Sequence, residues 1–311
     1  MNSETTRRTF LVACGVVMVF CAGGVRPALG QDKGIKGIDA DEFIMKRPRK
    51  PPGTGTMVRK KPTYSSYEAV RSAAPPKGKV FADVGVTIWR FRPSKPIDKT
   101  KELVEIEGAQ NSEWTLERVR EGTLLAPGQV VRLTVESLSR EGYLYVISRE
   151  AYADGSLGDP RLIFPGKSTP AGGNFVKAGK MIYVPGPPRY FLIKPSRSAK
   201  RHIAETLTLL VSSQPLIDPA LSATPITSEQ VELWESQWAT RTTRFEMEQG
   251  AGQSMTEEEQ NAATDNANLT QEDPTPQTIY RLAIKSDDAV VIRVPLRFTQ
   301  SKVGNLTNSK P

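Results

Sequence analysis

The 311-residue chain has few of the residue types that build catalytic or metal centres. Both of its cysteines, Cys14 and Cys21, lie in the first 30 residues. Residues 31–311 therefore cannot form a disulfide, a thiolate nucleophile, a cysteine-ligated zinc site or an iron–sulfur cluster. His202 is the sole histidine, which excludes a two-histidine metal site within one chain. We expect no metal and no cofactor, and we assign no catalytic, cofactor-binding or metal-ligating residue.

Long apolar runs are also missing near the N-terminus. The uncharged stretch between Arg8 and Arg26 has 17 residues, whereas a membrane-spanning helix needs roughly 20 apolar residues. The stretch also contains Gly15, Gly23 and Gly24, which weaken a helix. It has the length of a signal-peptide core rather than that of a typical span.

Residues 1–30 are predicted to be an export signal peptide. The pair Arg7-Arg8 before Thr-Phe-Leu is typical of the twin-arginine route. Ala28-Leu29-Gly30 is a small-x-small cleavage site, so we expect the mature protein to begin after it, in the periplasm or cell envelope. An uncleaved N-terminal anchor is the alternative. Lipidation at Cys14 is disfavoured, because only a few residues separate it from the arginine pair.

The net charge of +8 is unevenly distributed along the chain. Residues 1–30 contribute +2 and residues 31–80 contribute +7, whereas residues 81–311 carry −1. Residues 31–80 are also rich in proline and glycine, so we predict a disordered basic spacer. The spacer suits contact with an anionic surface such as lipid headgroups or an acidic wall polymer, or it is a tether without a ligand. Nucleic acid is not an expected partner of an exported protein, and a membrane is one only if the signal is retained.

Short β-like runs divided by turns begin at about residue 81, and they predict an all-β domain over 81–299. In Val130–Glu136 three apolar residues alternate with three polar ones, as in a half-buried strand. This run and Gly142–Arg149 are predicted to form a hairpin. The other predicted strands in this part of the chain are Val84–Phe91, Arg161–Phe164, Lys180–Val184, Arg189–Lys194 and Glu205–Ser212.

The C-terminal part of the domain contains a second predicted hairpin, over 279–298. Its strands are Ile279–Lys285 and Ala289–Phe298, on either side of a Ser-Asp-Asp turn. Pro295 cannot donate a hydrogen bond to a neighbouring strand, so the last strand is predicted to lie at a sheet edge. Residues 300–311 are predicted to be a disordered tail.

One amphipathic helix is predicted over 228–247. Thr227 and Gln230 resemble a capping box, and the apolar residues that follow lie on one helical stripe. We expect Trp234 and Trp238 on that stripe to pack on a sheet, and a docking or sugar-stacking surface is the alternative. Asn111–Glu121 is predicted to be a short helix or a loop. The polar and acidic segment 250–275 is predicted to be a disordered insert.

Three short motifs contain residue types that can carry chemistry. Asp154 and Asp159 flank a glycine-rich loop that favours a plain hairpin turn, with a cation site or a catalytic carboxylate pair as alternatives. Gly166-Lys167-Ser168 is not a phosphate loop, because Arg161 stands where the pattern needs glycine. His202 follows a basic run without any G-x-S-x-G elbow in the chain, so we expect a surface-loop histidine.

Several short motifs occur in an order that resembles a known bacterial family. They are Gly142-Tyr143-Leu144-Tyr145, Asp154-Gly155, Phe164-Pro165, Ala178-Gly179 and the closing apolar run Glu205–Leu216. Together they resemble the "domain of unknown function 4384" family over residues 82–216. The resemblance implies a β-sandwich-like module, often fused to signalling or caspase-like domains or exported alone. It carries over no catalytic residues.

These observations predict an all-β, β-sandwich-like domain with one packed amphipathic helix, preceded by a basic spacer. The leading functional hypothesis is an exported, non-enzymatic binding module of the bacterial cell envelope, whose partner is a protein or an envelope polymer. The first rival is a carboxylate-based hydrolase that acts on envelope glycans. The second is a structural subunit of an envelope complex.

Overall fold

The computed structural model describes residues 37–52, 61–66, 74–104, 113–167, 169–170, 172–194, 196, 200–217 and 226–299. All of them belong to the unit Ile35–Pro311. The predicted signal peptide and the predicted tail lie outside the described residues, so both stay predictions. Within the described residues, no helix has the length and apolar character needed to cross a bilayer.

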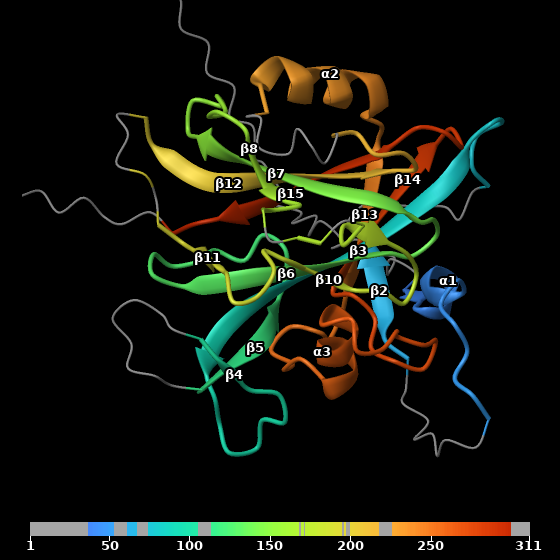
Figure 1. Cartoon of the computed structure of the whole chain (residues 1–311), viewed down its shortest axis with the longest axis vertical. Coiled ribbons are helices and arrows are strands. Elements are labelled where there is room, and N and C mark those ends of the chain that lie inside the picture. The colour runs from blue at the N-terminus through green and yellow to red at the C-terminus, as the bar shows by residue number, and fades with distance from the viewer. Residues whose placement is uncertain are drawn as a thin grey trace, which may run out of the picture. The chain divides into compact units, whose positions relative to one another are not determined.

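Two antiparallel sheets form the domain, as predicted (Figure 1). The path of the first sheet is β1 (Ile38–Asp39), β2 (Thr63–Ser66), β13 (Thr242–Met247), β14 (Thr278–Ile284), β3 (Val80–Pro93), β5 (Glu113–Val119) and β4 (Glu102–Leu103). On this sheet β6 (Val130–Ser137) also pairs with β3, and β10 (Ile182–Val184) and β11 (Phe191–Leu192) pair with β6. The second sheet consists of β15 (Val290–Arg297), β12 (His202–Ser212), β7 (Gly142–Tyr152) and β8 (Arg161–Phe164), with β9 (Phe175–Val176) beside β7.

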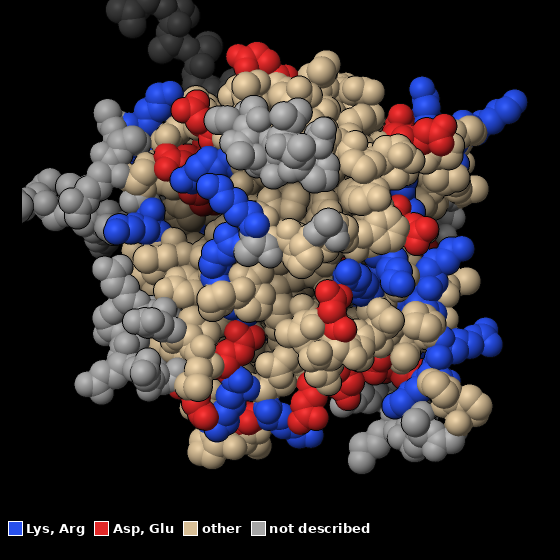
Figure 2. Space-filling view, in the orientation of Figure 1, with Lys and Arg blue, Asp and Glu red and all other residues tan. Residues whose placement is uncertain are grey.

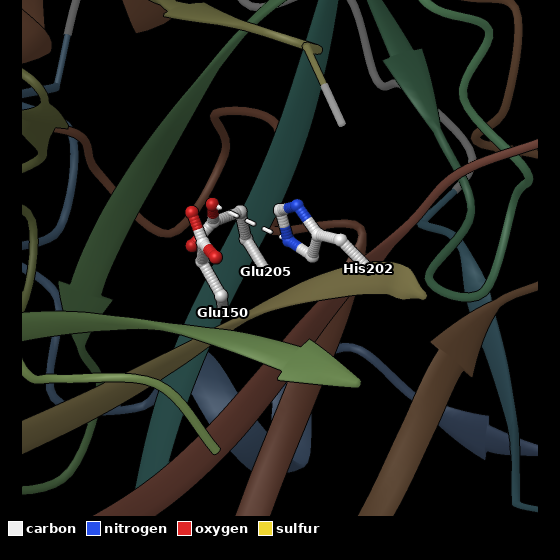
Figure 3. A group of neighbouring side chains, drawn as sticks. All are labelled: Glu150, His202 and Glu205. Carbon is white, nitrogen blue, oxygen red and sulfur yellow. Dashed lines mark ion pairs between the residues drawn. The ribbon is translucent and has the colours of Figure 1, made fainter. Parts of the chain in front are cut away.

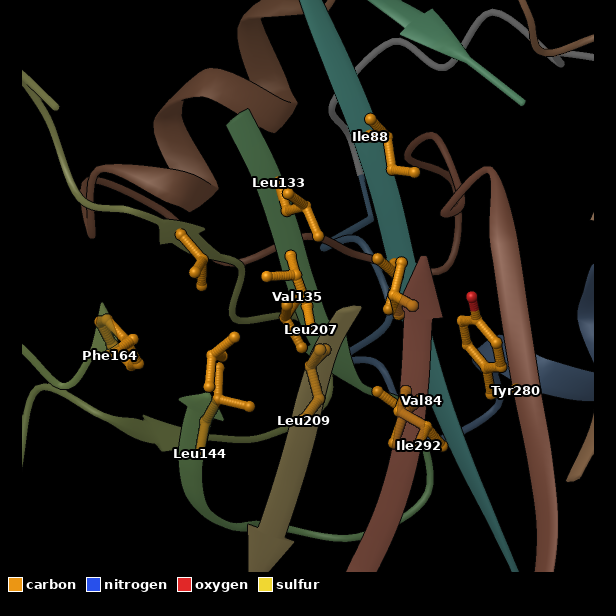
Figure 4. Packing of buried hydrophobic residues seen from close by; sticks show 14 of the residues in the cluster. Val84, Ile88, Leu133, Val135, Leu144, Phe164, Leu207, Leu209, Tyr280 and Ile292 are labelled. Atoms are coloured by element: carbon orange, nitrogen blue, oxygen red, sulfur yellow. The ribbon is translucent and has the colours of Figure 1, made fainter. Parts of the chain in front are cut away.

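The main core lies between the facing sides of the two sheets (Figure 4). Leu133 and Val135 of β6 face it from the first sheet, and Leu207 and Leu209 of β12 face it from the second. Their exposed fractions are at most 1%. Burying each such side chain contributes about 1.5–3 kcal/mol. The alternation predicted for residues 130–136 is confirmed, because its apolar half points into this core. The prediction of a half-buried strand is wrong, because the polar residues on the other side of β6 are buried as well.

Both predicted hairpins are wrong. β6 lies in the first sheet and β7 in the second, and β14 and β15 are divided in the same way. After β6 the chain stays on the first sheet, because the Leu138 backbone N–H donates to the Asp83 carbonyl and the Leu138 side chain is fully buried. Alternation specifies which side of a strand is buried, but it does not specify which sheet the strand joins. The edge position predicted from Pro295 is confirmed, since among the described strands β15 is the outermost of the second sheet and pairs with β12.

Parts of the predicted basic spacer belong to the folded domain. Phe43 and Ile44 of α1 (Asp41–Ile44) are 2% exposed, and Tyr64 of β2 is fully buried. The Phe43 ring lies 5.5 Å from the Tyr64 ring and 5.1 Å from the Phe245 ring. The prediction is therefore corrected for 37–48 and 61–66, where a few apolar residues among many charges are enough to anchor the segment. Residues 31–36, 53–60 and 67–73 lie outside the described residues.

The predicted helix over 228–247 is correct only in its first half. α2 spans Ser228–Trp238, and the Thr227 hydroxyl accepts a hydrogen bond from the Gln230 backbone N–H at 3.2 Å, as predicted. The chain then extends into β13, where Phe245 pairs with Ile279. In residues 242–247, pairing with β14 therefore determines the structure, although the apolar spacing of these residues also fits a helix. Asn111–Glu121 likewise contains strand β5 instead of a helix or a loop.

The predicted packing of the helix on a sheet is confirmed. Val231 and Trp234 of α2 lie on Tyr145, Ile147 and Leu210 of the second sheet. Trp234 is 7% exposed, so its ring is part of the core rather than a docking surface. In Figure 1, α2 lies across the outer side of the second sheet.

The predicted disordered insert 250–275 is folded. It contains α3 (Glu257–Ala263), which begins with a capping box between Thr256 and Glu259. Met255, Ala262 and Leu269 are at most 2% exposed. In Figure 1, α3 lies against the outer side of the first sheet, on the opposite side of the domain from α2. The acidic composition was misleading because its central carboxylate is buried in an ion pair, as described below.

Candidate functional site

A cavity of about 510 Å³ lies where the N-terminal segment, the loop after β13 and the residues around α3 meet. Its size is within the range of small-molecule sites in proteins. The lining residues are Ala40, Ile44, Lys61, Pro62, Thr63, Arg118, Met247, Glu248, Gln249, Gln253, Ser254, Thr256, Glu259, Gln271, Glu272, Asp273, Pro274 and Thr275. Two stretches far apart in sequence, 40–63 and 247–275, therefore build most of one site, and most of each lies in a segment with a prediction of disorder.

Arg118 and Glu259 form a buried ion pair in the cavity wall. Each side chain is 2% exposed, and the Arg118 Nη2 donates to Glu259 Oε1. The Arg118 Nη1 donates to the Thr275 carbonyl at 2.7 Å, and its guanidinium lies 5.1 Å from the Trp89 ring centroid. The Thr256 backbone N–H donates to the second Glu259 oxygen at 3.0 Å. The positive charge of Arg118 and the negative charge of Glu259 therefore neutralise each other, and hydrogen bonds hold both side chains in position.

The wall is anchored by a second buried ion pair, between Arg47 and Glu136. Two hydrogen bonds of 2.8 and 2.6 Å join the two side chains. The Arg47 Nη1 also donates to the carbonyls of Thr270, Asp273 and Pro274 at 3.1–3.3 Å. Burial lowers the Arg47 pKa, but the attraction of Glu136 outweighs it and the pKa is raised overall. Arg47 therefore holds the loop 270–274 in position beside the cavity.

Tyr64 fixes the same loop from the other side. Its hydroxyl donates to the Pro276 carbonyl and lies 2.7 Å from the Thr275 Oγ1. Burial raises the Tyr64 pKa, so the phenol stays protonated and remains a donor. β2 therefore contributes a fixed wall to the cavity.

The mouth of the cavity is acidic. Glu248 and Glu272 are exposed, and no ion pair or side-chain hydrogen bond joins either carboxylate to any described residue. Asp273 is half-buried, and its Oδ2 accepts hydrogen bonds from the Thr270 N–H and hydroxyl at 2.7 and 2.8 Å. Lys61, the basic residue of this rim, pairs with Asp41. On the face of the molecule in Figure 2, acidic and basic residues are interspersed.

A second cluster consists of Glu150, His202 and Glu205 (Figure 3). One potential ligand atom from each residue lies within 4.8 Å of those of the other two. The prediction of a surface-loop histidine is wrong, because His202 begins β12 and is 4% exposed. Its ring packs edge-on against Phe298 at 4.9 Å. No local pattern in the sequence indicates this contact, because it depends on the pairing of β12 with β15, the strand that precedes Phe298.

The hydrogen bonds of this cluster argue against a metal site. The Ser196 backbone N–H donates to His202 Nδ1 at 2.9 Å, so that nitrogen carries the lone pair. His202 Nε2 then carries the proton and faces the Ala204 carbonyl at 2.9 Å. A metal on Nε2 would force a proton onto Nδ1, against the Ser196 N–H. The arrangement suits a neutral imidazole that ties the preceding loop to β12.

Both carboxylates of the cluster accept hydrogen bonds from the domain itself. Glu150 accepts from the Tyr152 hydroxyl at 2.5 Å and from the Ser196 hydroxyl at 3.1 Å. The Tyr152 hydrogen bond lowers the pKa of Glu150 from its usual range. Glu205 accepts from the Ser148 hydroxyl at 2.6 Å.

The predicted turn at Asp154 is present. Asp154 Oδ1 accepts hydrogen bonds from the Ser156 N–H at 2.8 Å and from its hydroxyl at 2.6 Å. Gly155 has φ +83°, which favours glycine. Asp159 is also exposed. Neither aspartate lines the cavity or belongs to the cluster around His202.

A scan against protein-family models, a search of curated proteins and a search of solved structures each give no match to this chain. The resemblance to the "domain of unknown function 4384" family therefore stays a prediction.

Proposed function

We propose that this chain is a non-enzymatic binding module of the bacterial cell envelope, and that its ligand occupies the cavity beside α3. The observation that carries the proposal is the cavity of about 510 Å³. It combines apolar residues such as Ile44 and Met247 with hydroxyl, amide and carboxylate groups, as ligand sites do. A protein segment or part of an envelope polymer is the proposed class of partner.

The chemistry of the wall favours binding over catalysis. Arg118 is engaged by Glu259 and by the Thr275 carbonyl, so it is poorly placed to stabilise developing charge. Ser254 and Thr256 supply hydroxyls, but the described lining residues include no histidine to activate them. His202 belongs to the other cluster. The wall offers polar recognition without an activated nucleophile.

Site-specific photocrosslinking tests the proposed binding site. A benzophenone amino acid at Gln249 would stand at the cavity, and the same group at Leu233 would stand on the exposed side of α2. We expect adducts with envelope material in cells from position 249 and few from position 233. Equal labelling at both positions, or none at 249, contradicts the proposal.

Export is the other half of the proposal, and it rests on the sequence of residues 1–30. Changing Arg7 and Arg8 to lysine is expected to retain a fused reporter inside the cell. Unchanged export would contradict the twin-arginine route.

The second candidate function is a carboxylate-based hydrolase that acts on envelope glycans. The proximity of Glu150 and Glu205 favours it, because retaining glycosidases place two carboxyl groups about 5–5.5 Å apart. Purified mature protein is expected to leave wall glycans intact. Turnover that is lost in Glu150→Gln and in Glu205→Gln would replace the binding proposal with this one.

A further inference from the structure

The charges around the cavity identify the class of ligand, given the proposed binding function on which this inference rests. Two cationic side chains line the cavity, and both are neutralised by carboxylates of the protein. Arg118 is paired with Glu259, and its Nη1 is used by the Thr275 carbonyl. Lys61 is paired with Asp41. An anionic ligand would therefore have to compete with an existing ion pair for either cation.

The negative charges are not balanced in the same way. Within the described part of the chain, no side chain pairs with the carboxylates of Glu248 and Glu272, and both residues line the cavity. The Arg120 guanidinium donates instead to the Glu248 backbone carbonyl at 2.8 Å. Asp273 adds a third carboxylate, held in position by Thr270. The field at the mouth therefore attracts cations and repels anions. Three carboxylate residues of the cavity lining also offer acceptors to an ammonium group, which has three donors.

The apolar part of the wall suits the aliphatic stem of such a cation. Ile44, Pro62 and Met247 line the same cavity as the carboxylates. Lysine-like chains bury their methylene groups on apolar surface while the charged end stays with polar partners. The volume of about 510 Å³ admits a small ligand such as a peptide of a few residues.

We propose that the cavity beside α3 binds a primary ammonium group on an aliphatic chain, with Glu248 and Glu272 as its recognition residues. A lysine side chain of a short peptide and a free polyamine share this chemistry. The ammonium donates to the carboxylates at the mouth, and the methylene chain lies along Ile44 and Met247. This assigns the two unpaired carboxylates a role in specificity.

Calorimetric titration of the mature protein tests the proposal with three probes. They are the tripeptide Gly-Lys-Gly, the same peptide acetylated on the lysine side chain, and spermidine. The test variant is Glu248→Gln with Glu272→Gln. The matched control is Glu232→Gln with Glu141→Gln, which makes the same change in net charge at two exposed residues outside the cavity.

We expect saturable binding of an amine probe to the wild type and to the control variant. We expect the test variant to bind the amine probe at least about tenfold more weakly than the wild type, because charged hydrogen bonds are lost. Binding of the tripeptide alone, or of spermidine alone, supports the ammonium and identifies its source. Equal binding of the acetylated peptide, equal weakening in both variants, or no binding of any amine overturns the proposal. The photocrosslink at Gln249 separates these failures from failure of the binding function, because it labels whatever occupies the cavity.

Discussion

The two helical coverings of the domain differ in how deeply their ion pairs are buried. α2 covers the second sheet mainly with apolar contacts, in which Val231 and Trp234 pack on Tyr145 and Leu210. Its Glu235 also accepts a hydrogen bond from the Thr208 hydroxyl and pairs with the exposed side chain of Arg293. α3 covers the first sheet, where Glu259 forms a buried ion pair with Arg118. The first covering was predicted from the sequence, and the second was predicted to be disordered. A stripe of apolar residues indicates in the sequence that a helix face is buried. A glutamate that will be buried cannot be told from an exposed glutamate by sequence alone.

The difference also bears on function. The region around α3 meets the N-terminal segment at a cavity of about 510 Å³, and no residue of α2 lines that cavity. Charged residues need hydrogen-bonding partners when they are buried. Arg47 and Arg118 satisfy this need with backbone carbonyls of the loop 270–275, and they thereby shape the cavity wall.

The largest expected effect comes from removing the carboxylate beneath α3. Glu259→Ala leaves the Arg118 guanidinium buried without its counter-charge, so the free energy of unfolding should fall by about 3–5 kcal/mol. Urea denaturation measures it. The double variant Arg118→Met with Glu259→Leu removes both charges and should lose less than the single variant. A loss below about 1 kcal/mol for Glu259→Ala would mean that the ion pair does not hold this covering.

The corresponding change in α2 is Trp234→Ala. It should lower the free energy of unfolding by about 3 kcal/mol, because it leaves a cavity where the ring packs. Here a conservative apolar replacement should be tolerated, so Trp234→Phe should cost clearly less in the same urea experiment. At α3 the isosteric Glu259→Gln should remain costly, because the charge is lost. Equal tolerance of Trp234→Phe and Glu259→Gln would remove the distinction between the two coverings.

A smaller effect is expected at the two helix starts. Thr227→Ala and Thr256→Ala each remove a side-chain acceptor for a backbone N–H, at a cost of about 1 kcal/mol. α3 is shorter than α2, so Thr256→Ala should also speed hydrogen exchange at the Gln260 amide. Unchanged exchange at that amide would show that tertiary contacts alone maintain α3.

The smallest effect is expected at Glu150, outside both coverings. Its pKa is lowered in the folded state by the Tyr152 hydrogen bond. A lowered pKa gives stability that is present above the unfolded value of about 4.3 and is lost as the pH falls through the folded pKa. Glu150→Gln should therefore cost less than about 1 kcal/mol at pH 7, and the difference from wild type should shrink near pH 3. A constant difference between these pH values would show that ionisation of Glu150 plays no part.

The sequence was sufficient for several local features. The alternation in β6, the edge position of Pro295 and the Thr227 N-cap all depend on neighbouring residues, and all three are confirmed. The assignment of strands to sheets was not predictable in this way, because β6 and β7 have similar buried faces.

The candidate site was missed because its contacts join distant residues. Arg47 bonds to Glu136, 89 residues away, and Arg118 bonds to Glu259, 141 residues away. One local signal was present: Thr256 and Glu259 have the spacing of a capping box, which marks the start of a helix. That spacing indicates helix α3 but not its partner on the first sheet.

Methyl NMR of the methionines tests most directly whether the cavity beside α3 is the binding site. Met247 lines the cavity, and Met181 is buried outside it. On addition of Gly-Lys-Gly, the account predicts a saturable shift of the Met247 methyl signal while the Met181 signal stays in place. An unchanged Met247 signal at peptide concentrations that saturate the calorimetric titration would place binding elsewhere and contradict the account.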